Sequence, residues 1–81
     1  MSLVDDLKTV RRHIPTMHDY RQFMSIPKAI ATALPDGPPI RHRRVLMALE
    51  ASHDGGRLNS HKAIIGLFRR AITAASDGQS N

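Results

Sequence analysis

The pattern of apolar and polar positions is clearest near the C-terminus. Apolar residues there recur three and four positions apart, so they share one face of a helix. They are Ile64, Leu67, Phe68, Ala71, Ile72 and Ala75. Asn59 or Ser60 can cap the first free amide groups, and Asp77-Gly78 supplies a stop signal. The pattern therefore predicts a helix over residues 60–76.

A second helix is predicted over residues 39–53. Its narrower stripe consists of Val45, Ala48, Leu49 and Ser52, widened by Leu46. Pro39 suits the first turn, because a proline there loses no hydrogen bond that the helix needs. The Asp54-Gly55-Gly56 run ends the helix, since glycine adopts backbone conformations that other residues resist. The connection to the last helix is short, so we expect an antiparallel or angled helix pair.

A shorter helix is predicted over residues 26–34. Its shared face consists of Ile26, Ala29, Ile30, Ala33 and Leu34. Ser25 can cap this helix, and Pro35 ends it. The proline- and glycine-rich run that follows, residues 35–39, is a stiff turn too short to separate domains.

The first 24 residues give a less uniform pattern. Ser2 to Asp5 resembles a capping box, and Leu3, Leu7, Val10 and Ile14 lie at helical spacing, which indicates a helix near residues 3–9. Residues 10–24 fit either two short strands or more helix. We therefore predict one small domain over residues 1–81, with 77–81 as a frayed tail. Its expected class is mainly α, a small α+β fold with an N-terminal β-hairpin at about 10–24 and three helices; the alternative is an all-α bundle.

Composition narrows the functional classes. The chain has no cysteine, which excludes disulfides, thiol catalysis and cysteine-based zinc sites. No apolar run is long enough to span a membrane, and the two aspartates near the N-terminus argue against a targeting segment. We accordingly expect a cytoplasmic protein.

Charge is concentrated in the second half of the chain. Residues 1–37 carry five basic and four acidic side chains, a net charge of +1, whereas residues 38–81 carry seven and three, a net charge of +4. An electropositive half favours an anionic partner, although the same charge also keeps a small protein soluble. The candidate surface for an anionic partner consists of Arg41, Arg43, Arg44, Arg57, Lys62, Arg69 and Arg70.

No pattern of catalytic, metal-binding or cofactor-binding residues is present. None of the five histidines pairs with another at the spacing of metal ligands on a helix, so we expect surface or capping roles and no metal or cofactor. The acidic residues lie at segment ends and are interpreted as exposed. Acid–base catalysis needs paired groups in a pocket, so we expect no enzyme and no small-molecule substrate.

Residues 21–75 resemble the short alphaproteobacterial proteins grouped as domain of unknown function 982. The matching positions are Arg21, Phe23, Ser25, Ala29, Leu34, Pro35, Gly37, His42, Arg43, Arg44, Ala48, Ala51, Gly56, Phe68, Ala71 and Ala75. The chain departs from the family's pattern in three ways: no tryptophan precedes Pro35, the arginine-rich helix lacks a cysteine, and no glycine-rich turn lies between Ile14 and Tyr20. The resemblance implies a bacterial protein with an N-terminal β-hairpin followed by three helices, and no established activity.

These observations favour a small, non-enzymatic bacterial binding module with a basic C-terminal helical surface. We expect its partner to be an anionic molecule or a protein, and that protein can be a second copy of the same chain. The alternative is a helix–turn–helix-like DNA-binding regulator with residues 60–76 as the recognition helix. Met47 and Ile65 lie beside the apolar stripes; if both are exposed, they form an apolar patch rimmed by arginine, as many protein interfaces do.

Overall fold

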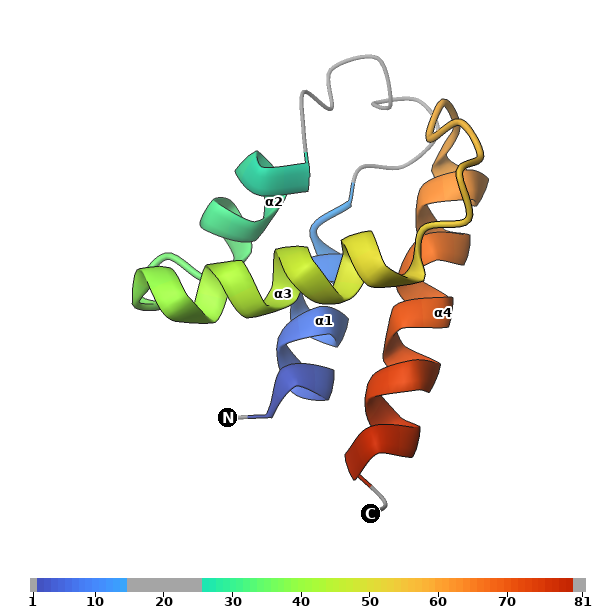
Figure 1. Ribbon diagram of the computed structural model, residues 1–81. Coiled ribbons are helices and arrows are strands. Elements are labelled where there is room, and N and C mark those ends of the chain that lie inside the picture. The colour runs from blue at the N-terminus through green and yellow to red at the C-terminus, as the bar shows by residue number, and fades with distance from the viewer. Residues whose placement is uncertain (1, 15–25, 80–81) are drawn as a thin grey trace.

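The computed structural model describes residues 2–14 and 26–79, and all regular structure within these ranges is helical. The helices are α1 (Leu3–Arg12), α2 (Ile26–Ala33), α3 (Pro39–Ser52) and α4 (His61–Gln79) (Figure 1). The three predicted C-terminal helices are confirmed. With no strand in the described ranges, the fold fits the all-α alternative better than the α+β prediction.

The helices pack around one core. α1 and α4 lie side by side and antiparallel, so that α1 begins at the end of the molecule where α4 finishes (Figure 1). α3 runs across both of them, and α2 packs mainly against α3. The core consists of Leu7, Val10, Ile14, Ala29, Ile30, Leu34, Val45, Leu49, Ile64, Leu67, Phe68 and Ala71, of which Ile14 and Leu34 lie just after the ends of α1 and α2. None of the described helices has both the length and the apolar character needed to cross a membrane.

α1 is longer than its pattern predicted, and this corrects part of the β-hairpin prediction. The Ser2 hydroxyl accepts a hydrogen bond from the Asp5 amide at 3.1 Å, which confirms the predicted cap. The helix then continues through Arg12, because Val10 belongs to the same buried face as Leu7. Residues 10–12, assigned above to the hairpin or left open, are therefore helical, and residues 15–24 lie outside the described ranges.

The boundaries of the last two helices differ slightly from the prediction. α3 ends at Ser52, and Gly55 adopts a positive φ of 87° in the connection, as expected of a glycine. The Ser60 hydroxyl accepts from the Ala63 amide at 3.1 Å, so Ser60 caps α4. α4 continues past Ser76 to Gln79. Asp77-Gly78 does not stop it, because a glycine within a helix costs only about 1 kcal/mol and no proline follows.

Candidate binding surfaces

Arg41 belongs to the interior packing of the protein. Its Nε and Nη2 atoms donate to the two carboxylate oxygens of Asp6 at 3.0 and 2.7 Å, which joins α3 to α1. Asp6 is only 2% exposed. The hydrogen bonds from Arg41 lower the pKa of Asp6 against the opposing effect of burial, and the same bonds raise the pKa of Arg41. The interpretation of all acidic residues as exposed is therefore wrong for Asp6.

The sequence contains a signal for this ion pair. Asp6 lies three positions after Leu3 and four before Val10, so a helical α1 places its carboxylate on the apolar face. A buried carboxylate needs a cationic partner with matching hydrogen-bond geometry, and arginine supplies two parallel donors. What the sequence did not indicate is which of the basic residues would reach it.

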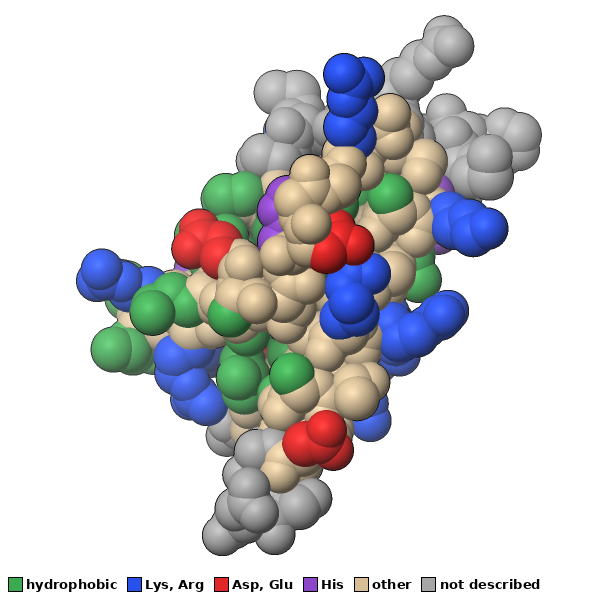
Figure 2. All heavy atoms as spheres, turned by 45° about the vertical axis from the view of Figure 1, so that its right-hand side comes forward, with side chains coloured by type: hydrophobic (Ala, Val, Ile, Leu, Met, Phe, Trp, Pro, Cys, Tyr) green, Lys and Arg blue, Asp and Glu red, His purple; other side chains and the backbone are tan. Residues whose placement is uncertain are grey.

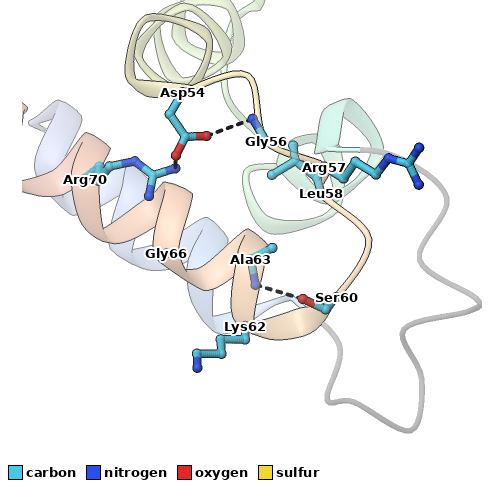
Figure 3. Close-up of a pocket in the computed structure, with 9 residues that line it drawn as sticks. All are labelled: Asp54, Gly56, Arg57, Leu58, Ser60, Lys62, Ala63, Gly66 and Arg70. Carbon is cyan, nitrogen blue, oxygen red and sulfur yellow. Dashed lines mark hydrogen bonds and ion pairs between the residues drawn. The ribbon is translucent and has the colours of Figure 1, made fainter.

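A groove lies between the connection 54–60 and the first turns of α4 (Figure 3). Its volume is about 350 Å³. The lining residues are Asp54, Gly56, Arg57, Leu58, Ser60, Lys62, Ala63, Gly66 and Arg70. Gly66 contributes no side chain, and a methyl group added there would lie 3.7 Å from an Arg70 guanidinium nitrogen. The groove is thus open beside the basic face of α4, which carries the exposed residues Lys62, Arg69 and Arg70.

One wall of this groove is fixed by hydrogen bonds. The Asp54 carboxylate accepts from the Gly56 amide at 2.9 Å, and Arg70 donates from Nε to the Ser52 carbonyl oxygen at 3.2 Å. Arg70 also pairs with Asp54 at 3.8 Å (Figure 3). The Gly56 amide, and secondarily Arg70, lower the pKa of Asp54. Asp54 is the only carboxylate among the described residues that line the groove, and its negative charge is already balanced by Arg70 and by the Gly56 amide.

The remaining cations of the groove have no partner among the described residues. Neither Arg57 nor Lys62 forms an ion pair or hydrogen bond there. With Arg70 included, three cations face one carboxylate, so the groove has a net charge of +2. Figure 3 shows that the side chains of Arg57 and Lys62 point away from each other and out of the groove. Arg69 is also exposed, on the side of α4 that faces away from the core.

α3 presents a different kind of surface, which we call the outer face of α3. It consists of Ile40, Arg43, Arg44, Met47, Glu50 and Ala51, all of which are exposed. Ile40 and Met47 are 67% and 58% exposed, the largest exposed apolar side chains of the described residues. Ile65, which the sequence paired with Met47 as a candidate patch, is instead partly buried against the core. The patch on α3 is therefore built around Ile40 and Met47.

The seven basic residues predicted to form one surface lie in three separate places. Arg41 lies between α1 and α3, Arg43 and Arg44 lie on the outer face of α3, and the other four lie in or beside the groove. Figure 2 shows the consequence, because lysine and arginine side chains are spread over this view with acidic side chains between them. The seven candidates do not converge on one site.

Three of the four histidines in the described ranges lie within hydrogen-bond distance of backbone carbonyl oxygens. The side chains of His13, His42 and His53 lie 2.9, 2.7 and 2.7 Å from the carbonyl oxygens of Thr9, Leu34 and Gly56. The Nδ1 atom of His61 is buried without a partner among the described residues. Within residues 2–14 and 26–79, no three histidine or acidic side chains lie close enough together to hold a metal ion.

Comparison of the chain with protein families, with characterised proteins and with solved structures gives no match. The resemblance to domain of unknown function 982 therefore stays a prediction.

Proposed function

We propose that the protein is a non-enzymatic binding module that binds an extended anionic polymer along the groove and the basic face of α4. The observation that carries this proposal is the excess of cations in the groove, three against one carboxylate. Unpaired arginine and lysine side chains attract anions, and arginine can make two hydrogen bonds to one phosphate group.

The directions of the side chains favour an extended ligand over a small one. Arg57 and Lys62 diverge, whereas the cations of a small-anion site converge on one point (Figure 3). Lys62 and Arg69 are separated by about 10 Å along the helix axis, given a rise of about 1.5 Å per residue. Phosphates repeated along a nucleic-acid backbone can meet such dispersed charges one by one. A nucleic-acid duplex is therefore the first ligand to test.

The alternative is sequence-specific recognition by a helix–turn–helix arrangement of α3 and α4. It is favoured by the outer face of α4, where Lys62, Gly66, Arg69 and Thr73 include no large apolar side chain. Against it stands the connection of eight residues from His53 to Ser60, which is longer than the usual tight turn of that motif. We therefore favour binding to the phosphate backbone of a nucleic acid over sequence-specific recognition.

The test is a salt titration of duplex binding, measured by fluorescence anisotropy with a labelled 20-base-pair duplex. If Arg57, Lys62 and Arg69, which have no partner among the described residues, each neutralise one phosphate, the log–log slope is about −2.7, and binding weakens about 40-fold between 50 and 200 mM salt. Removing two of the three contacts in Lys62→Ala with Arg69→Ala is expected to reduce the slope to about −0.9. The matched control is Lys8→Ala with Arg12→Ala, which removes two exposed cations from α1.

Absence of binding at about 50 mM salt overturns the proposal, and so does an equal loss in the α1 control. A preference of more than about 1,000-fold for one duplex sequence from a randomised pool favours the helix–turn–helix alternative.

A further inference from the structure

Gly66 lies in the interior of α4, where glycine is an unfavourable residue. A glycine within a helix is destabilising relative to alanine, because it loses more backbone freedom on folding. Outside the helix backbone, the first atom of a described residue that a methyl group on Gly66 would meet is Nη1 of Arg70, at 3.7 Å. This is an ordinary van der Waals distance, and Gly66 does not have a positive φ. The fold therefore has room for an alanine at this position.

The two glycines that precede α4 are different, because the fold itself needs them. Gly55 has a positive φ of 87°, a conformation that residues with a side chain rarely adopt. A methyl group on Gly56 would lie 3.0 Å from Oδ1 of Asp54, the same oxygen that accepts the Gly56 amide. Gly55 and Gly56 thus shape the connection between α3 and α4, whereas the described structure gives Gly66 no such role.

Gly66 lines the groove between two of its cations. Lys62, Gly66 and Arg70 are four positions apart, so they follow one another on successive turns along one side of α4. Figure 3 shows Gly66 on the helix between Lys62 and Arg70. Each step covers about 6 Å along the helix axis, given a rise of about 1.5 Å per residue. A polymer that crosses α4 between these two cations therefore passes directly over Gly66.

We propose that Gly66 lets the sugar–phosphate backbone of a nucleic-acid duplex lie directly against the backbone of α4, between Lys62 and Arg70. This inference rests on the function proposed above and assigns the point at which the polymer enters the groove. Without a Cβ atom at this point, the ligand can approach the helix more closely by about 1.5 Å, the length of a carbon–carbon bond. The attraction between a phosphate and a cation grows as they approach, so the missing side chain strengthens binding to both cations.

The test enlarges the side chain at position 66 while it leaves every charge of the groove in place. Alanine and leucine are both strong helix formers, so Gly66→Ala is expected to raise the melting temperature by about 4 °C, measured by circular dichroism. In the anisotropy titration with the labelled duplex, Gly66→Ala is expected to weaken binding about tenfold, and Gly66→Leu more than that. Stability and affinity thus change in opposite directions, which a glycine needed only for the fold would not produce.

The matched control is Ala31→Leu, which adds bulk at an exposed position of α2 outside the groove. It is expected to leave affinity within about twofold of the wild type. Equal affinities of the wild type, Gly66→Ala and Gly66→Leu overturn the inference and leave the proposed function standing, because dispersed charges then suffice. Absence of binding by the wild type overturns both. A lower melting temperature in Gly66→Ala, or an equal loss of affinity in Ala31→Leu, overturns the inference alone.

Discussion

Two carboxylate–arginine pairs among the described residues combine the same two residue types and differ in structure. Asp6 and Arg41 join α1 to α3 through two hydrogen bonds, the shorter at 2.7 Å, with the carboxylate 2% exposed. Asp54 and Arg70 meet at 3.8 Å with side chains 63% and 45% exposed. The first pair is part of the packing, and the second lies at the edge of an open groove. The same two residue types thus serve either to hold helices together or to shape a surface.

The difference comes from the helix face on which each carboxylate lies. Asp6 shares a face with Leu7 and Val10, so folding removes it from water whether or not a cation is present. Asp54 follows α3 in an exposed connection and could be solvated without Arg70. A buried charge is costly without its partner, whereas an exposed ion pair contributes little. The two pairs should therefore respond very differently to mutation.

The largest effect is expected from Arg41→Ala. It leaves the Asp6 carboxylate, which is 2% exposed, without its cationic partner, so we expect a larger loss of stability than in any of the variants below. Urea denaturation gives the free energy of unfolding directly. Arg44→Ala, three positions along the same helix and exposed, is the matched control and should unfold close to the wild type.

A second substitution sharpens this prediction. Adding Asp6→Asn to Arg41→Ala replaces the unpaired charge with a neutral amide, so the double variant should be more stable than Arg41→Ala alone. If the double variant is less stable than Arg41→Ala, the buried charge is not the cause of the loss.

Acid should remove the contribution of the same pair. The folded state lowers the pKa of Asp6 below its ordinary value of 3.8, so between the two values the unfolded chain binds more protons than the folded one. The contribution of Asp6 to stability is therefore complete above pH 3.8 and is lost as the pH falls through the folded-state pKa. Denaturation series from pH 6 to 2.5 should show the advantage of the wild type over Asp6→Asn shrinking toward zero. For Asp5→Asn, on the exposed side of α1, no comparable advantage is expected.

A smaller effect is expected at the edge of the groove from Ser60→Ala. The Ser60 hydroxyl accepts the Ala63 amide at 3.1 Å, and loss of an N-cap typically costs about 1 kcal/mol. Ser60→Asp is the matched variant, because aspartate also caps a helix and should retain most of the stability. An alanine variant as stable as the wild type would show that the cap is not needed.

The smallest effect is expected from Arg70→Ala. Its pair with Asp54 is long and exposed, and its bond to Ser52 is accessible to water, so the melting temperature should fall less than in Ser60→Ala. Circular dichroism measures both variants under one condition. A fall as large as that of Arg41→Ala would erase the distinction between the two pairs.

The helical pattern predicted much of the fold from sequence. The stripes centred on Leu67, Leu49 and Ile30 all became core, because a helix in so small a domain must bury its apolar face. The helix caps at Ser2 and Ser60 could also be predicted, since they depend only on neighbours within one turn. The extension of α1 through Arg12 could not be predicted, because short windows of mixed residues fit strand and helix equally well.

The candidate surface was harder to predict because it depends on contacts between distant positions. Arg41 and Arg44 lie three positions apart, on the same side of one helix. Only Arg41 forms hydrogen bonds with Asp6, which lies 35 positions away in sequence. The exposure of Met47 and the partial burial of Ile65 likewise follow from how α3 and α4 sit on their neighbours. Periodicity assigns a side chain to a face of its helix, and packing decides whether that face is covered.

The proposed binding surface consists of the groove and the basic face of α4, and it is separate from the residues that maintain the fold. Amide chemical shifts of the isotopically labelled protein, recorded while a 20-base-pair duplex is added at about 50 mM salt, test this separation. We predict that the largest shifts fall on Arg57, Lys62, Gly66 and Arg69, and that Asp6 and Arg43 change little. Shifts centred on α3, or no shifts at saturating duplex, would contradict the claim.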